Sequence, residues 1–194
     1  MNKAEKTKQF IIEKTAPIFN MKGYSGTSMQ DITLATGLTK GSIYGNFKNK
    51  DEVALAVFQY NYEKMQTLFI QEISKKTTYR EKLMSYPELY EKFATERFPL
   101  GGCPIMNTAI EADDTHPQLK ALAKKAMLFW KDSLVRLINK GIEKNEFKST
   151  TNADENALTI IALIEGAIMM INLTGKLDYH QSMMNTLRKV ITAL

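Results

Sequence analysis

Five side chains between residues 39 and 46 could together contact a nucleic acid. They are Thr39, Lys40, Ser42, Tyr44 and Asn46, and each carries a hydrogen-bond donor. Lysine can donate to guanine and asparagine can pair with adenine, although most contacts in such interfaces go to phosphate and sugar. Gly41 either lets the backbone approach a groove closely or merely weakens a helix. We predict that this segment meets base edges, with Lys40 and Asn46 as candidate base readers.

Phosphate contacts are expected from side chains that flank this segment, namely Thr27, Tyr44, Lys48 and Lys50. The distribution of charge supports this expectation. The chain of 194 residues has a formal net charge of +5, and residues 1–50 hold eight lysines against three acidic residues, so the remainder sums to zero. A solvated lysine surface would be the ordinary interpretation of such an excess. Because the excess is confined to one segment, we interpret it as attraction to a phosphate backbone.

Two short helices must position these side chains. Thr27 with Gln30 could cap the first helix, and Gly37 stands where a helix ends in a left-handed residue. Thr39 could cap the second helix. The faces expected to be buried carry Ile32, Ala35, Ile43 and Phe47. Two such helices joined through a glycine turn form a helix-turn-helix, whose second helix enters the major groove of DNA.

The residues around this motif resemble the tetracycline-repressor (TetR) family of bacterial transcription factors. The matching positions are Ile11-Ile12-Glu13-Lys14-Thr15-Ala16-Pro17-Ile18-Phe19, Gly23, Thr27, Ile32-Thr33, Gly37-Leu38-Thr39-Lys40-Gly41-Ser42-Ile43-Tyr44, Phe47 and Lys50. The resemblance implies a homodimer that binds an inverted-repeat operator in double-stranded DNA. It also implies a helical domain that binds a small-molecule inducer, and Lys50 resembles the family's phosphate-holding lysine.

Helical periodicity continues through the remainder of the chain and predicts an all-α fold of about nine helices. Helices are expected over residues 2–22, 50–74, 79–97, 105–112, 117–145, 154–174 and 179–194. Pro87 should interrupt or restart its helix. The helix from residue 117 should bury Leu122, Leu128, Phe129, Leu134, Val135 and Ile138. We predict a helix-turn-helix DNA-binding domain over residues 1–48 and a ligand-binding and dimerisation domain over residues 49–194.

The last two helices and several aromatic residues suggest where a partner and a ligand would bind. In the picture that the resemblance implies, the dimer interface includes Ile160, Ile164, Gly166, Ala167 and Ile171, although burial within one protomer would also explain so broad an apolar surface. Residues that could line a ligand pocket are Phe58, Tyr62, Met65, Tyr90, Phe93, Met106, Asn107, Phe129, Trp130, Glu165 and Met169. Aromatic and methionine residues at helical spacing also form ordinary cores. Asn107, Glu111 and Glu165 stand out as polar groups beside apolar runs.

Cys103 permits a second kind of sensing. It follows two glycines at an expected helix start, where the helix dipole can lower the pKa of a thiol. Modification of that thiol could then release DNA. The Gly-Gly-Cys context resembles that of thiol-sensing members of the family. A buried cysteine that acts as a small hydrophobic residue is the alternative.

Other functional classes find little support in the sequence. The two histidines, His116 and His180, lie beside expected helix starts, and no spacing typical of a metal site or a nucleophile is present. We therefore expect neither catalysis nor a cofactor. A helical protein-interaction module would leave the basic helix-turn-helix unexplained. No signal peptide is expected, and the apolar stretch from Ala157 to Leu173 is short for a membrane span. These features predict a cytoplasmic protein.

Overall fold

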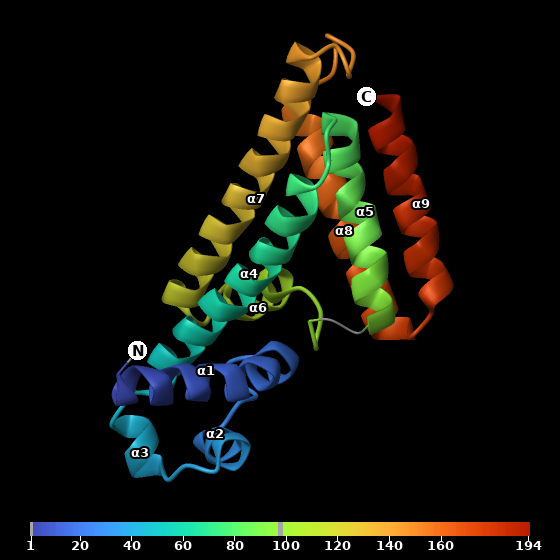
Figure 1. The fold of residues 1–194 in the computed structure, drawn as a ribbon. Coiled ribbons are helices and arrows are strands. Elements are labelled where there is room, and N and C mark those ends of the chain that lie inside the picture. The colour runs from blue at the N-terminus through green and yellow to red at the C-terminus, as the bar shows by residue number, and fades with distance from the viewer. Residues whose placement is uncertain (1, 97–98) are drawn as a thin grey trace. The chain divides into compact units, whose positions relative to one another are not determined.

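The computed structural model describes residues 2–96 and 99–194, and every regular element in these ranges is a helix (Figure 1). The all-α prediction is therefore confirmed. The helices are α1 (Lys3–Lys22), α2 (Met29–Thr36), α3 (Lys40–Tyr44), α4 (Lys50–Ser74), α5 (Tyr79–Glu96), α6 (Pro104–Ala112), α7 (Pro117–Glu143), α8 (Ala153–Thr174) and α9 (Leu177–Ala193).

The helices form two compact units. The first, which we call the head unit, comprises Met1–Lys64 and Pro99–Lys125. The second, the C-terminal unit, comprises Met65–Phe98 and Ala126–Leu194. The head unit therefore contains α1, α2 and α3 together with α6, which lies some sixty residues further along the chain than α3. The predicted functional boundary after residue 48 stays a prediction, because compactness alone does not assign function.

Local capping explains where the first helices begin and end. Helix α1 ends at Gly23 as the sequence predicts, and Asn2 caps its start. The cap of α2 differs from the prediction. The Ser28 side chain, rather than that of Thr27, accepts the backbone N–H of Asp31, and its capping-box partner is Asp31 rather than Gln30. Lys22 and Ser28 together hold the pKa of the Asp31 carboxyl well below its usual range, since both donate hydrogen bonds to it.

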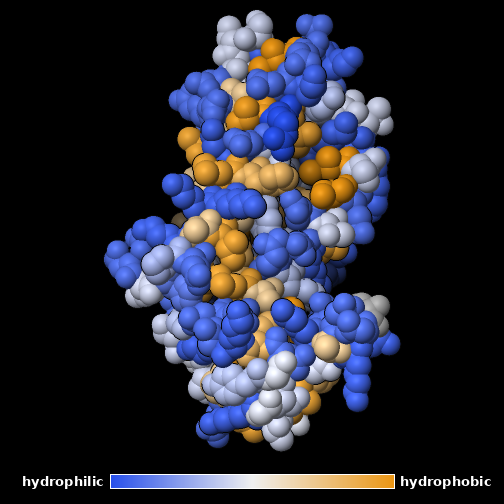
Figure 2. All heavy atoms as spheres, turned by 90° about the vertical axis from the view of Figure 1, so that its left-hand side faces the viewer, coloured by the Kyte–Doolittle hydropathy of each residue, from blue (hydrophilic) through white to orange (hydrophobic). Residues whose placement is uncertain are grey.

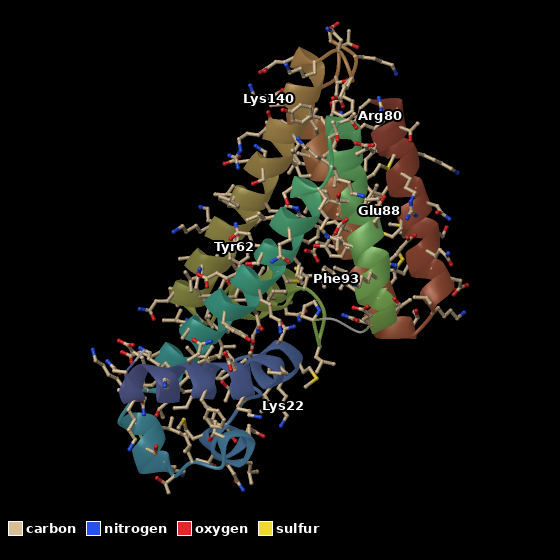
Figure 3. The ribbon with its side chains drawn as sticks, in the orientation of Figure 1. Lys22, Tyr62, Arg80, Glu88, Phe93 and Lys140 are labelled. Carbon is tan, nitrogen blue, oxygen red and sulfur yellow. The ribbon has the colours of Figure 1, made fainter. Side chains whose placement is uncertain are left out.

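The C-terminal unit is built around α5, α8 and α9. Its fully buried side chains include Leu83, Ile160, Ile164, Ala167, Leu187 and Ile191. Arg80, at the start of α5, lies beside the end of α9 (Figure 3) and donates to the carbonyl oxygens of Ile191 and Thr192 at 2.8 and 3.0 Å. Further along, Arg188 on α9 forms a two-bonded ion pair with Glu91 on α5. Apolar packing and charge-assisted bonds therefore both join these helices.

Two expectations for the longer helices are wrong. Helix α5 continues through Pro87 without interruption, and Pro87 is itself buried among Tyr86, Leu89 and Tyr90. Packing of this face thus outweighs the backbone donor that the proline lacks. Leu128 and Phe129 on α7 were expected inside but are 49% and 47% exposed. Other apolar side chains also reach the surface, as Figure 2 shows for one face of the molecule.

Helix α8 begins and ends within one residue of its predicted bounds, although its apolar stretch was expected to be short for a membrane span. It has 22 residues and a mean hydropathy of 1.9, so length and composition alone would allow it to cross a membrane. Such a helix is weak evidence for a membrane span, because core helices share these properties. Three α8 residues, Ile160, Ile164 and Ala167, are fully buried among the helices of the C-terminal unit. Of the most apolar 18-residue window of α8, 33% is buried, so the helix contributes to the core with one side.

Candidate nucleic-acid interface

Helix α3 has one buried side and one exposed side. Ile43 and Phe47 are 1% and 2% exposed and anchor the helix in the head unit. Lys40 and Tyr44 are exposed and are separated by one helical turn, so they project from the same face. Thr39 caps the helix by accepting the backbone N–H of Ser42 at 3.2 Å. The arrangement presents a cation and a phenol to solvent from a firmly held helix.

The remaining residues of this segment that were predicted to contact DNA differ in exposure and in the partners that they have within the protein. The Asn46 amide donates to the carbonyl oxygen of Ser42 at 2.8 Å, which fixes its orientation and leaves its oxygen available. The Lys48 side chain is 88% exposed and has only a distant carboxylate neighbour, Glu52, at 3.7 Å. A methyl group added at Gly41 would meet nothing closer than the Thr39 hydroxyl at 3.9 Å. The fold itself therefore does not require a glycine at residue 41.

Thr27 is wrongly predicted as a DNA contact. Its side chain is completely buried, and its hydroxyl donates to the carbonyl oxygen of Gly23 at 2.6 Å. The hydroxyl group closes the turn between α1 and α2 and cannot reach a phosphate from this position.

Lys50 is also engaged inside the head unit. Its ammonium group donates to the carbonyl oxygens of Tyr24 and Thr27 at 2.8 and 3.0 Å and lies 4.0 Å from the centre of the Tyr24 ring. The cation that was predicted to hold a phosphate therefore holds protein backbone. This correction depends on a contact between residues far apart in the sequence, which the local pattern around residue 50 does not contain.

The sequence analysis did not assign three further polar residues, Glu111, Tyr24 and His116, to the head unit. Glu111 on α6 accepts the backbone N–H groups of Tyr24 and Ser25 at 2.6 and 2.7 Å. The hydroxyl of Tyr24 donates to Asp51, and this bond, with burial and the Asp51 charge, raises the pKa of Tyr24 to about 12. The His116 ring packs edge-on against Tyr24 with 4.7 Å between centroids. Gly23 offered the only local hint, since a glycine there permits close packing.

The residues predicted to line a ligand pocket fall into both units. Phe58, Tyr62, Met106 and Asn107 belong to the head unit, and Met65, Tyr90, Phe93, Trp130 and Glu165 to the C-terminal unit. Two predictions are wrong, because Phe129 and Met169 are 47% and 52% exposed and do not face an interior. The amide of Asn107 donates to the carbonyl oxygens of Asn20 and Gly101, which gives it a structural role.

Aromatic side chains gather in the C-terminal unit around Phe69. Its ring lies 4.9 Å from Tyr86, 5.4 Å from Tyr90 and 6.0 Å from Phe93, measured between centroids. Tyr90 in turn stacks on Trp130 at 6.4 Å. Three of the predicted lining residues, Tyr90, Phe93 and Trp130, thus share one aromatic cluster. Phe93 (Figure 3) and Tyr90 are almost completely buried.

The head unit contains a small crevice between α1, α4 and α6. Its walls include Asn20, Phe58, Asn61, Asn107 and Glu111, and its volume is about 30 Å³. Ligand sites for small organic molecules have volumes of roughly 300–1,000 Å³. The crevice therefore accommodates water rather than an inducer.

The predicted dimer contacts are mostly in the wrong place. Ile160, Ile164 and Ala167 are fully buried within one protomer and cannot contact a second copy. Gly166 and Ile171 are partly exposed. A different row of α8 residues faces solvent, and these are Leu158, Ala162, Met169 and Leu173. Their spacing of four, seven and four residues places them on a single helical stripe.

Cys103 is 2% exposed and occupies the residue before α6 without capping it through its side chain. A soluble reagent could reach its sulfur only after local opening of this segment. The two preceding glycines, Gly101 and Gly102, adopt φ angles of +90° and +88°. The structure thus favours the alternative interpretation, that of a small buried hydrophobic residue.

Known proteins match this chain along most of its length. The family model of bacterial regulatory proteins, tetR family, matches residues 11–57, and that of the tetracyclin repressor-like C-terminal domain matches residues 80–187. A TetR-family transcriptional regulator from Cytophaga hutchinsonii is 45% identical, with a TM-score of 0.96, over 100% of this chain and 97% of its own.

Two further similar proteins are also transcriptional regulators. A TetR transcriptional regulator from Chloroflexus aurantiacus is 36% identical, with a TM-score of 0.93, over 99% of this chain and 97% of its own. The HTH-type transcriptional repressor DhaR from Mycobacterium sp. is 26% identical over 86% of this chain and 82% of its own. With the helix-turn-helix geometry of α2 and α3, these matches show that the chain belongs to the TetR family of DNA-binding transcriptional regulators.

Proposed function

We propose that the chain is a homodimeric repressor that binds an inverted-repeat operator and is released by a small-molecule inducer. Residues 1–48 would bind DNA, and residues 49–194 would bind the inducer and form the dimer. The protein would act in the cytoplasm without a cofactor or catalysis. The observation that carries this proposal is helix α3, in which buried Ile43 and Phe47 hold exposed Lys40 and Tyr44 toward solvent.

Contacts to DNA would come from a smaller set than the sequence suggests. We assign Lys40, Ser42, Tyr44 and Asn46 to the groove and Tyr44 and Lys48 to phosphate, with Thr39 as the helix cap at its edge. Gly41 would lie against the groove, because the fold leaves space for a side chain there and none is present. Thr27 and Lys50 would act indirectly by holding the turn before α2.

The dimer would form through the exposed stripe of α8. Exposed apolar surface of this kind commonly marks a protein interface. Leu158, Met169 and Leu173 are 50%, 52% and 83% exposed in the single chain. A twofold dimer would place two α3 helices on two half-sites of DNA, one helical turn or a multiple apart.

Selection of bound duplexes from a random DNA library, followed by sequencing, would test the proposal. Enrichment of an inverted repeat is the expected result. Binding without any enriched motif would contradict specific recognition and reduce the head unit to a basic surface. Repeating the selection with Lys40→Ala separates two roles: a lysine that reads guanine should relax one position of the motif, whereas a phosphate contact should weaken binding uniformly.

A further inference from the structure

The turn that joins α1 to α2 is held from two sides by opposite charges. We call residues 23–27 the head turn. Lys50 on α4 donates to its carbonyl oxygens at Tyr24 and Thr27. Glu111 on α6 accepts its N–H groups at Tyr24 and Ser25. One cation thus satisfies two acceptors of the turn, and one anion satisfies two of its donors.

The seat of the Glu111 carboxylate is shaped for it. Gly23 has a φ of +72°, and a Cβ atom at this residue would lie 2.3 Å from a carboxylate oxygen of Glu111. Only a glycine leaves space for the carboxylate to reach the two N–H groups. The bonds from these N–H groups to Glu111 are 2.6 and 2.7 Å long. Such charge-assisted bonds are among the stronger hydrogen bonds in proteins.

Helix α6 grips the same junction at a second point. Asn107 lies one helical turn before Glu111, so both side chains project from one face of α6. The Asn107 amide donates to the carbonyl oxygen of Asn20, three residues before Gly23. Ile110, on an adjacent side of α6, is 76% exposed. The Asn107 and Glu111 side chains on this face thus hold the end of α1 and the head turn, and Asn107 also donates to the carbonyl oxygen of Gly101.

Helix α2 begins at Met29, directly after the head turn, and α3 follows it. The orientation of both helices relative to α1 and α6 therefore depends on the conformation of the turn. We propose that Glu111 is a positioning residue for DNA binding: it fixes the helix-turn-helix at the angle that an operator requires by holding the head turn to α6. This inference rests on the proposed function.

A positioning role of Glu111 can be separated from a purely stabilising one with operators that differ in the spacing between half-sites. The full-length chain would be compared with Glu111→Gln and Glu111→Ala, and with Asp114→Asn as a control that removes the same charge from an exposed residue nearby. Affinity would be measured for the selected operator, for operators with one base pair inserted or deleted between half-sites, and for unrelated duplex DNA. Thermal melting would identify a temperature at which each variant is folded.

We expect Glu111→Ala to lose about tenfold in affinity for the selected operator while affinity for unrelated DNA stays unchanged. Its preference for the correct half-site spacing should also shrink, because a loosened helix-turn-helix adapts to several spacings. Destabilisation alone would lower the affinity for all duplexes alike. Asp114→Asn should behave like the unaltered chain.

The inference is overturned if both Glu111 variants keep the affinity and spacing preference of Asp114→Asn. It is likewise overturned if all duplexes are weakened equally. Should Glu111→Ala fail to fold, Glu111→Gln decides, since a neutral amide of the same size keeps one acceptor and loses the charge. Failure of the proposed function would look different, because the unaltered chain would then select no inverted repeat.

Discussion

At the scale of single residues, buried and partly buried polar groups organise the head unit. Thr27, Lys50 and Glu111 all hold the backbone of the head turn, and each does so through an atom within 3.0 Å of its partner. Such bonds contribute most when the partner would otherwise be buried without one. Residues that resemble DNA contacts in a local pattern are therefore part of the scaffold behind the interface.

Replacing Thr27 by valine tests this assignment. Valine keeps the shape but leaves the Gly23 carbonyl oxygen without its 2.6 Å partner, so the free energy of unfolding should fall by about 1–2 kcal/mol. The salt dependence of DNA binding should not change. Thr7→Val is the matched control, because the Thr7 hydroxyl makes a similar bond on an exposed surface. A stable Thr27→Val protein whose salt dependence falls by about one phosphate contact would restore the original prediction.

His180 should make the stability of the protein depend on pH. Burial lowers its pKa below the usual value, against a weaker opposite effect from Glu91. The unfolded chain therefore binds this proton more readily than the folded one. Stability is fully present above the usual histidine pKa and is lost as the pH falls through the lower folded pKa. Urea unfolding at pH 7.5 and at pH 5 should show a larger loss for the unaltered chain than for His180→Gln, and equal losses would contradict the assignment.

The sequence predicts side-chain roles well where the partner is close in the chain. Gly37 ends α2 and Thr39 caps α3 as expected, since their partners lie within four residues. It fails where the partner is distant. The bonds of Lys50 span 23 and 26 residues, and those of Glu111 span 86 and 87. Periodicity carries no information on such contacts, so these two roles emerge only from the fold.

At the scale of elements, the two sides of each helix determine what a substitution does. Gly41 in α3 has open space around it, whereas Gly141 in α7 faces the Phe147 ring, which a Cβ atom would approach to 2.1 Å. Helix propensity alone predicts that alanine stabilises both positions. The packing predicts opposite outcomes for the two helices.

Gly41→Ala should fold at least as stably as the unaltered chain and bind its operator more weakly. Alanine favours a helix, and the only neighbour of the new methyl group is the Thr39 hydroxyl at 3.9 Å. The methyl group would separate α3 from the groove. Urea unfolding and operator titration on the same samples would measure both effects. Undiminished affinity would show that the backbone of α3 does not approach DNA closely here.

Gly141→Ala should destabilise the C-terminal unit by about 1–3 kcal/mol, because the buried Phe147 ring has to move. Gly41→Ala in α3 serves as the control, since the nearest atom there, the Thr39 hydroxyl oxygen, is 3.9 Å away. That control should gain up to about 1 kcal/mol from helix propensity. Urea unfolding of both variants checks the contrast, and a stabilised Gly141→Ala protein would refute it.

Helix boundaries could be predicted from the sequence. Which face of each helix is buried could be predicted less well. Helix α6 begins and ends within one residue of its predicted bounds, because Pro104 and the acidic residues after Ala112 mark both ends. Pro87 misled the prediction for α5, since its ring is buried with Tyr86 and Tyr90. For α8, apolar residues surround the helix, and composition could not distinguish buried Ile160 and Ile164 from exposed Leu158.

At the scale of the whole molecule, assembly determines whether two DNA-binding helices can act together. Members of the TetR family dimerise, and the exposed stripe of α8 is the surface that we assign to this contact. Leu158 lies two positions from Ile160, and Met169 lies two positions from Ala167, so the stripe and the buried residues occupy different sides of the helix. One helix would thus form the core of each protomer with one side and the dimer with the other.

A charge placed on this stripe should separate the protomers. Leu158→Glu and Met169→Glu should sediment as folded monomers at micromolar concentration and lose affinity for an inverted repeat, because a buried carboxylate at an interface is costly. Ile70→Glu is the control, since Ile70 is 60% exposed on a different helix, α4. Dimeric Leu158→Glu and Met169→Glu proteins in analytical ultracentrifugation would move the interface elsewhere.

The head unit is discontinuous in sequence, and this has a practical consequence for exchanging parts between regulators. A chimera that joins residues 1–48 of this protein to the sensor of another family member would discard both Lys50 and Glu111. The transplanted helix-turn-helix would then be held correctly only if the recipient supplies a cation and a carboxylate that bind the head turn. Swaps that also carry residues 49–64 and 99–125 would keep the head unit intact. The useful crossover points therefore lie inside α4, before residue 99 and inside α7, rather than at the end of the motif.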